Sequence, residues 1–450
     1  MKNTTVHILI TGFFLILGFT GANAQMPGSP AIPLKEMRNL YGGSNSDQFF
    51  DMLPTSDGGY LICGLASSSD GDVIGNHGGS DGWLVKIRST GDIEWQKTYG
   101  GTGDDDFRNF IQTPDGGYIL CGTTRSLNGD VTGNHGGNDG WVVKVSSTGT
   151  LEWQKAYGGT GNDNFRRILT TSDGGYLLVG ASSSSNGDVT TNQGGSDAWV
   201  VKISNTGTLQ WQKTYGGTAN DNFMNASQTS DGGYLLSGNA ANSSGDITGN
   251  HGDLDGWVVK INSTGTLQWQ KTYGGTQIDV FRDMVATPDG GYLISGNTDS
   301  SDGDVTGNHG NVDGWLVKIG NTGILEWQKT YGGSLNDMFY SLVPASDGGY
   351  VALGHTWSSD GDVTVNYGGP DLWAVKVSNT GILQWQKSYG GTGADFSFSI
   401  KNVNGGYCIM GYSASNDTNV AGPNHGSNDG IIFKLDSNGN IQGFYDDTSL

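Results

Sequence analysis

The sequence predicts an all-β protein: a seven-bladed β-propeller with four antiparallel strands in each blade. An Asp-Gly-Gly-Tyr turn recurs at 57–60, 115–118, 173–176, 231–234, 289–292 and 347–350, and an Asn-Gly-Gly-Tyr turn follows at 404–407. The first six copies are spaced 58 residues apart, and a fixed period of this length indicates a repeat architecture. Strand-forming residues dominate between the turns, and no stretch shows a helical period.

Each copy divides into four short strands, which are clearest in the second copy. We expect strand A at 107–113, a hairpin turn at 114–117 and strand B at 118–124. A long polar loop at 125–139 leads to strand C at 141–145, a tight turn at 147–149 and strand D at 151–157. A propeller is favoured over a solenoid, because solenoid repeats are usually shorter and have distinct end caps.

The seventh blade needs one more strand, and either end of the repeat region could supply it. Residues 34–41 run into Gly42 and Gly43 as every strand D runs into its glycine pair, and residues 441–445 also stand at a strand D position. We expect the N-terminal segment to complete the blade.

Three kinds of repeated side chain are expected to build the interior. The tryptophans at the start of strand C and within strand D should form the core between blades, since each ring buries a large apolar area. The strand C lysines should either form a repeated structural ion pair or bury only their aliphatic stems, and Cys63 and Cys121 should be small buried residues. The tryptophans are Trp83, Trp141, Trp199, Trp257, Trp315 and Trp373 in strand C and Trp95, Trp153, Trp211, Trp269, Trp327 and Trp385 in strand D. The lysines are Lys86, Lys144, Lys202, Lys260, Lys318, Lys376 and Lys434.

The N-terminal 24 residues are typical of a signal peptide. Lys2 is followed by an apolar stretch at 8–19, and an Ala-Asn-Ala site at 22–24 predicts cleavage between Ala24 and Gln25. Residues 25–35 contain three prolines and predict a flexible lead-in to a propeller at 36–450. We therefore expect a secreted protein, extracellular or periplasmic, without membrane insertion. The net charge of −21 argues against nucleic acid as a partner, and we expect a monomer.

The repeat motif resembles a known family. The second unit reads Trp-Gln-Lys-Thr-Tyr-Gly-Gly at 95–101, Asp-Gly-Gly-Tyr at 115–118, Gly-Asp-Val at 129–131 and Asp-Gly-Trp at 139–141. It is similar to the secreted bacterial β-propeller repeat proteins with SBBP-type repeats, some of which are labelled endoglucanases. The resemblance covers residues 36–445 and implies a propeller and an exported location. It implies little about activity, because the shared motifs are those that build the blades.

The long loops suggest calcium as a cofactor. Asp70, Asp72, Gly75, Asn76 and Asp81 stand at positions 1, 3, 6, 7 and 12 of a calcium-binding loop, although position 5 is Ile74 and position 12 is not glutamate. The same aspartates and asparagines could instead cap backbone N–H groups within the loop, and both interpretations stay open. The histidines at 77, 135, 251, 309 and 425 should pack in these loops. The proposed ligands are Asp70, Asp72, Asn76, Asp81, Asp302, Asp304, Asn308, Asp313, Asp360, Asp362, Asn366 and Asp371.

Departures from the repeat indicate a binding site in the sixth copy. Trp357 is the only tryptophan outside the repeat positions, His355 lies two residues before it, and Tyr367 lies in the following loop. An exposed aromatic pair can stack on a sugar ring, whereas a filled gap at the blade edge is the structural alternative.

Two binding or catalytic functions and a purely structural role remain open. The favoured one is an exported, non-catalytic propeller that binds a glycan or a protein on the face formed by its Asp-, Asn- and Gly-rich loops. The alternative is an extracellular, endoglucanase-like glycoside hydrolase with an aspartate pair on that face, because such chemistry needs two carboxylates about 5–10 Å apart. No nucleophile elbow, phosphate-binding loop or zinc signature is present in the sequence.

Overall fold

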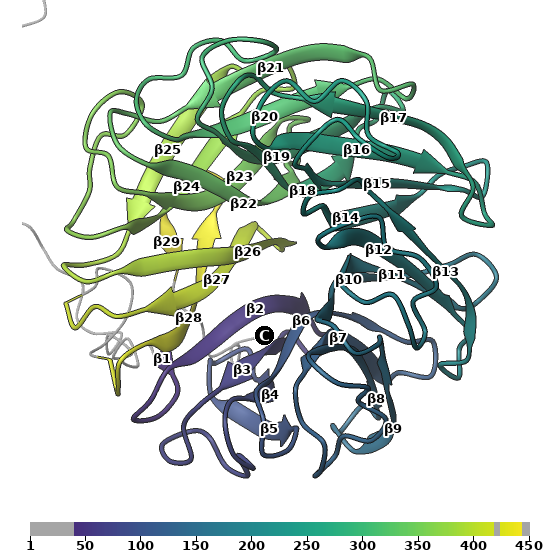
Figure 1. Cartoon of the computed structure of the whole chain (residues 1–450). Helices are drawn as coiled ribbons and strands as arrows, with labels where there is room; N and C mark the ends of the chain where they lie inside the picture. The colour runs from purple at the N-terminus through teal and green to yellow at the C-terminus, as the bar shows by residue number, and fades with distance from the viewer. Residues whose placement is uncertain (1–39, 418–423, 443–450) are drawn as a thin grey trace, which may run out of the picture. The chain divides into compact units, whose positions relative to one another are not determined.

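A computed structural model of the chain describes residues 40–417 and 424–442. These residues form seven antiparallel sheets arranged in a ring, six with four strands and one with a fifth strand off its main path (Figure 1). No helix occurs within these two ranges, and so none there could span a membrane. The predicted seven-bladed propeller is confirmed. The predicted signal peptide at 1–24, its cleavage site and the lead-in at 25–35 lie outside the described residues.

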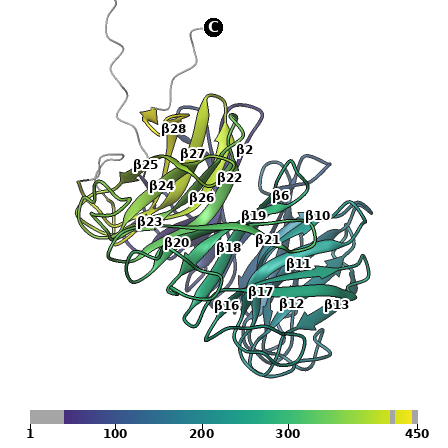
Figure 2. The ribbon, with the colours of Figure 1, turned by 90° about the horizontal axis from the view of Figure 1, so that it is seen from above.

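In blades 1 to 6 the strands A, B, C and D follow in chain order from the centre of the ring outwards, and Figure 2 shows the ribbon turned by 90°. Blade 1 consists of β2 (Asp47–Pro54), β3 (Tyr60–Ala66), β4 (Asp81–Ile87) and β5 (Ile93–Tyr99). Blade 2 consists of β6 (Asp105–Gln112), β7 (Tyr118–Thr124), β8 (Asp139–Val145) and β9 (Leu151–Tyr157). Blade 3 consists of β10 (Asp163–Thr170), β11 (Tyr176–Ser182), β12 (Asp197–Ile203) and β13 (Leu209–Tyr215). Blade 4 consists of β14 (Asn222–Gln228), β15 (Tyr234–Ala240), β16 (Asp255–Ile261) and β17 (Leu267–Tyr273). Blade 5 consists of β18 (Asp279–Ala286), β19 (Tyr292–Thr298), β20 (Asp313–Ile319) and β21 (Leu325–Tyr331). Blade 6 consists of β22 (Asp337–Pro344), β23 (Tyr350–Thr356), β24 (Asp371–Val377) and β25 (Leu383–Tyr389). Blade 7 holds β26 (Asp395–Val403), β27 (Gly406–Ser413), β28 (Asp429–Asp436) and two short strands, β1 (Leu40–Tyr41) and β29 (Ile441–Gln442).

The two faces of the ring differ in their connections. Because neighbouring strands are antiparallel, the long B–C loops and the D–A links emerge on one side, here called the loop-rich face. The Asp105 N–H donates to the Ser80 carbonyl at 2.6 Å, which ties the link into blade 2 to the long loop of blade 1. The Asp-Gly-Gly turns lie on the opposite side.

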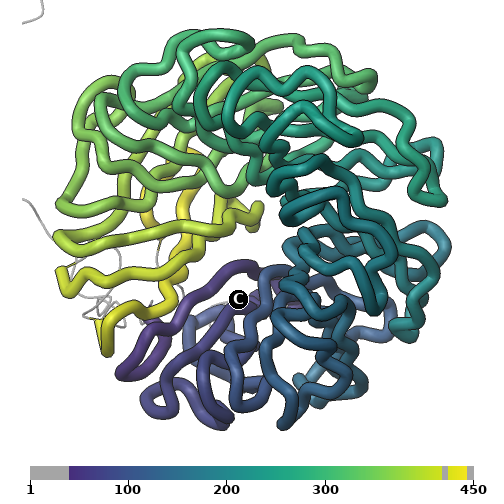
Figure 3. The backbone as a smooth tube through the Cα atoms, viewed as in Figure 1, coloured from purple at the N-terminus to yellow at the C-terminus, as the bar shows by residue number. Residues whose placement is uncertain are grey.

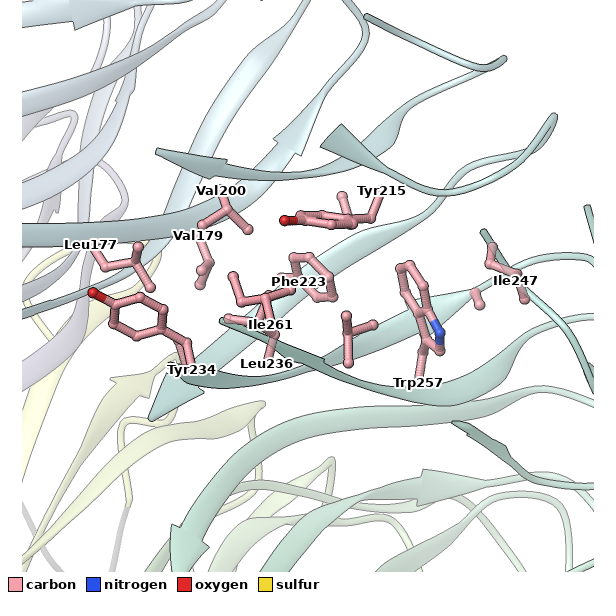
Figure 4. Close-up of a cluster of buried hydrophobic side chains, with 14 residues drawn as sticks. Leu177, Val179, Val200, Tyr215, Phe223, Tyr234, Leu236, Ile247, Trp257 and Ile261 are labelled. Atoms are coloured by element: carbon pink, nitrogen blue, oxygen red, sulfur yellow. The ribbon is translucent and has the colours of Figure 1, made fainter. Parts of the chain in front are cut away.

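Aromatic side chains fill the space between blades. Between blades 3 and 4, Tyr215, Phe223 and Trp257 lie in one apolar cluster (Figure 4). The Phe223 and Trp257 rings stack with centroids 5.2 Å apart, and the Trp257 Nε1–H donates to Gln270 at 2.9 Å. All six strand C tryptophans are fully buried, which confirms that they belong to the core between blades.

Both ends of the repeat region complete blade 7. Leu40 pairs with Ile431 on β28, whereas Gln442 pairs with Lys434 further along the same strand. Figure 3 shows the N-terminal purple segment beside the yellow C-terminal blade. The expectation that the N-terminal segment alone closes the ring was therefore incomplete, because β1 covers only part of the β28 edge and β29 covers another part.

The repeated polar side chains act structurally. In six blades the strand C lysine reaches the aspartate of the Asp-Gly-Gly turn, with N–O distances of 2.7–3.0 Å. In blade 7, where Asn404 replaces that aspartate, Lys434 lies over the Tyr60 ring of blade 1 at 5.4 Å. Cys63, Cys121 and Cys408 are buried free thiols. The predicted ion pairs are confirmed in six blades, and the predicted burial of Cys63 and Cys121 is confirmed.

Candidate functional site

The innermost strand of every blade carries a β-bulge at the same position. In β2 the pairing with β3 shifts between Phe49 and Asp51, so that Phe50 is the extra residue. The same shift occurs in β6, β10, β14, β18, β22 and β26. A bulge re-aims the side chain that it carries. The bulge residues are Phe50, Arg108, Arg166, Met224, Arg282, Tyr340 and Phe398.

A glycine on strand B accommodates each bulge. A methyl group on Gly354 would lie 1.5 Å from the Met338 carbonyl oxygen, and one on Gly64 would lie 1.9 Å from the Gln48 carbonyl oxygen. The close approach of the bulged backbone leaves no room for a Cβ, which explains why this position is always glycine. Strand B thus keeps the bulge fixed while the bulge residue itself is free to vary.

All seven bulge residues line one cavity of about 160 Å³, here called the axial cavity. A cavity of this volume holds several water molecules and is large enough for one sugar-sized group. A second cavity of about 260 Å³, here called the rim pocket, shares Arg108 and Arg166 with it. The rim pocket also takes in Ser80 and Asp104 from the loop-rich face. The two cavities therefore adjoin at these arginines and lead towards that face.

The axial cavity has an aromatic side and a basic side. Tyr340, Phe398 and Phe50 come from blades 6, 7 and 1, which are neighbours in the ring. The three arginines come from blades 2, 3 and 5. The Phe398 ring packs edge-on against Tyr340 at 5.6 Å and against Phe50 at 5.1 Å, so the three rings are continuous.

Cation–π contacts join the two sides. The Arg108 guanidinium lies 4.1 Å above the Phe50 ring, and the Arg282 guanidinium lies 5.0 Å from the Tyr340 ring centre. Arg108 also donates from Nε and Nη2 to Asp106 at 2.9 and 2.6 Å. Two of the three bulge arginines are thus positioned by groups of the protein.

The carboxylates of the axial cavity are held by neighbouring blades. Asp51 accepts hydrogen bonds from Asn109 at 2.6 Å and Ser399 at 3.0 Å, and Lys401 lies 2.8 Å from it. Asp283 accepts from Asn225, from the Ser341 hydroxyl at 3.2 Å and from the Leu342 N–H at 2.9 Å. These bonds tie the inner strands together below the bulges and leave neither carboxylate without donors.

The predicted aromatic site in blade 6 is assembled differently from the expected pair. His355 is buried, and its ring lies 4.9 Å from Trp357, 4.7 Å from Phe396 and 4.9 Å from Tyr340. Burial, helped by the Arg282 charge, lowers the pKa of His355 to about 3, so the imidazole is neutral. Trp357 packs on Phe396, behind the rings that line the axial cavity. Tyr367 is 43% exposed and contacts no aromatic ring of the described residues.

The proposed calcium ligands point to separate backbone groups. Asp70 accepts from the Ser44 N–H at 2.8 Å, Asn76 donates to the Ala66 carbonyl at 3.0 Å, and the buried Asp81 accepts from the His77 N–H and ring. Equivalent bonds recur in blade 5 at Asp302, Asp304, Asn308 and Asp313. They recur in blade 6 at Asp360, Asp362, Asn366 and Asp371, except that Asp371 accepts from the Tyr367 N–H and not from a histidine ring. Within the described ranges, no three His, Cys, Asp or Glu side chains come close enough to share a metal ion. Calcium binding stays an untested alternative to the backbone capping that these contacts show.

The bulge residues were missed in the sequence, although two signals mark them. A glycine recurs inside every strand B, at 64, 122, 180, 238, 296, 354 and 411, and an isolated glycine in a strand indicates a bulge or a close backbone approach. The residue after the strand A aromatic, or after Ser397 in blade 7, is also the place where an otherwise regular repeat changes its chemistry. Together, these signals would have pointed to the ring axis.

The chain resembles solved structures at low sequence identity. No protein-family model matches the chain, and no curated protein matches it. A Bacteroides caccae protein of unknown function is 13% identical with a TM-score of 0.40, covering 70% of this chain and 92% of its own. A puromycin hydrolase is 10% identical with a TM-score of 0.48, and the match spans 92% of this chain but only 54% of that enzyme. The Neurospora crassa Pan2 WD40 domain is 11% identical with a TM-score of 0.46, covering 92% and 94% of the two chains. These similarities leave the function to be inferred from the chain's own site.

Proposed function

We propose that this chain is a non-catalytic binding protein whose axial cavity holds a sugar-sized group of a glycan, reached from the loop-rich face. The observation that carries the proposal is the convergence of all seven bulge residues on one cavity. The blades are otherwise close copies, so the chain varies its chemistry where seven side chains meet. Bulges next to functional sites commonly re-aim side chains in this way.

The composition of the cavity favours a glycan over a protein partner. Three contiguous aromatic rings offer a stacking surface, while the arginines and the hydrogen-bonded carboxylates offer donors and acceptors for hydroxyl groups. A cavity of about 160 Å³ admits a sugar-sized group rather than a protein surface. Export through the predicted signal peptide, and membership of the secreted propeller repeat family, remain part of this proposal.

Binding is favoured over hydrolysis by the state of the cavity's carboxylates. Asp51 and Asp283 each accept several hydrogen bonds from neighbouring blades, which commits them to joining the inner strands. A glycoside hydrolase needs one carboxyl group that can give up a proton and a second that can act on the sugar or on water.

A glycan array read beside a reducing-sugar release assay tests the proposal. The chain from Gln25 onwards should bind glycans on the array without releasing reducing ends. Tyr340→Ala, which removes a ring from the cavity wall, should weaken binding, whereas Tyr367→Ala removes an exposed ring outside the cavity and should leave binding unchanged.

Two outcomes would count against the proposal. Failure of the chain to bind any glycan would remove the ligand class. Release of reducing sugar that one Asp→Asn change abolishes would replace binding by hydrolysis.

A further inference from the structure

The axial cavity carries a surplus of positive charge in a strongly acidic protein. Its lining includes five basic side chains and two acidic ones, Asp51 and Asp283. The whole chain has only 23 lysines and arginines and a net charge of −21. More than a fifth of the basic residues of this acidic chain therefore line one small cavity.

Arg166 differs from the other two bulge arginines. Arg108 pairs with Asp106 and lies over Phe50, and Arg282 lies over Tyr340. For Arg166, the described part of the chain provides no hydrogen bond, ion pair or aromatic contact. Its side chain is exposed to the solvent of the cavity, and it lines both the axial cavity and the rim pocket.

The position of Arg166 beside two other arginines disfavours its charged form. Desolvation inside the ring and the charge of Arg108, with a smaller effect from Arg282, lower the pKa of Arg166 to about 10, although the charge of Asp106 acts in the opposite direction. Arg166 is therefore still protonated at neutral pH. The Nε atom of Arg282 is also buried without a hydrogen-bond acceptor among the described residues. An anion in the cavity would relieve the repulsion and supply the acceptor that these groups lack.

We infer that Arg166, assisted by Arg282, docks an oxyanion carried by the ligand, so that the favoured ligand is an acidic sugar. The inference rests on the proposed glycan-binding function and names its ligand class. The planar guanidinium suits either a carboxylate or a phosphate, and it can bind either in a bidentate manner. The sugar ring would then lie against the aromatic side formed by Tyr340, Phe398 and Phe50.

The chain itself supplies the substitution that tests the inference. Met224 occupies the bulge position of blade 4, so Arg166→Met places in blade 3 a residue that the fold already accepts there. Arg88→Gln is the control, because it removes one positive charge from an exposed side chain at the C–D turn, on the opposite face.

Isothermal titration calorimetry should compare uronate-containing oligosaccharides with their carboxyl-reduced counterparts, and hexose phosphates with the parent hexoses. We expect the acidic member of one pair to bind more tightly than its neutral partner. Arg166→Met should weaken that binding by about ten-fold or more, the effect of one charge-assisted hydrogen bond, and Arg88→Gln should leave it unchanged. The pair that responds identifies carboxylate or phosphate as the anion.

The results separate this inference from the proposed function. Equal binding of acidic and neutral sugars, or unchanged binding by a folded Arg166→Met variant, overturns the inference while glycan binding stands. Binding of none of these sugars, together with a blank glycan array, overturns both.

Discussion

The carboxyl groups of Asp371 and Asp395 face each other across the backbone of Gly390. A methyl group placed on Gly390 would lie 2.1 Å from Asp371 Oδ1 and 2.7 Å from Asp395 Oδ2. Asp395 accepts hydrogen bonds from the Gly391 N–H and the Ser415 hydroxyl, whereas Asp371 Oδ1 has no donor among the described residues. Burial, together with the charge of Asp395, raises the pKa of Asp371 to about 7. Each of the other strand C aspartates also has one buried oxygen without a donor.

This arrangement predicts that stability falls as the pH rises from about 4 to about 7. The folded state keeps a proton on Asp371 that the unfolded chain, with an ordinary aspartate pKa near 3.8, has already lost. The stabilisation is therefore complete below pH 4 and is lost as the pH rises through the folded pKa. The stability of the Asp371→Asn variant should depend less on pH. At pH 8 its free energy of unfolding should exceed that of the natural chain by more than about 1 kcal/mol. Urea unfolding across the pH range measures it, and an unchanged slope in the variant would contradict the assignment.

Introducing into blade 6 the histidine found in five other blades should stabilise the folded protein at neutral pH. In those blades the histidine ring lies 2.6–2.9 Å from the strand C aspartate, but Tyr367 and Gln193 replace it in blades 6 and 3. Tyr367→His should therefore raise the free energy of unfolding at pH 7 by about 1 kcal/mol, the contribution of one hydrogen bond. His309→Tyr makes the reverse change in blade 5 and should destabilise by a similar amount.

The fold could be predicted from the sequence because its signals are local and repeated. A glycine turn between two apolar stretches specifies a hairpin by itself, and the 58-residue period needs no knowledge of contacts. The site depends on a convergence that the sequence does not display. Arg108, Arg166 and Arg282 lie 58 to 174 residues apart and meet only after the ring closes. Which of them has a partner depends on neighbours such as Asp106 and Tyr340, whose positions the bulges determine.

The strand B glycines should tolerate a methyl group far less than the turn glycines. Gly354→Ala would drive a Cβ into the Met338 carbonyl and should destabilise by more than about 3 kcal/mol or prevent folding. Gly348→Ala is the matched control. Gly348 has a φ of +86° but no atom within 4 Å of the added methyl group, so only about 1–2 kcal/mol of backbone strain is expected. If denaturant unfolding shows a similar loss of stability in both variants, the bulged backbone can move to make room for the methyl group.

Removing calcium should leave the melting temperature unchanged to within about 1–2 °C. The oxygen atoms that the calcium spacing predicts as ligands already accept backbone N–H groups, as Asp70 does from Ser44 and Asp302 from Thr276. A bound ion would have to displace these bonds. Differential scanning calorimetry with a chelator and with millimolar calcium distinguishes the cases. A melting temperature that rises with calcium concentration would establish the loops as calcium sites.

The hydroxyl of Tyr41 should contribute to ring closure as much as its equivalents contribute between other blades. It donates to the Gly91 carbonyl at 2.6 Å, joining blade 7 to blade 1, just as Tyr215 donates to Gly265 between blades 3 and 4. Both rings are buried, so Tyr41→Phe and Tyr215→Phe should each cost about 1 kcal/mol. The comparison is informative because β1 has only two residues, whereas Tyr215 belongs to a seven-residue strand. If Tyr215→Phe lowers the free energy of unfolding in urea while Tyr41→Phe does not, the N-terminal segment does not stabilise blade 7 in solution.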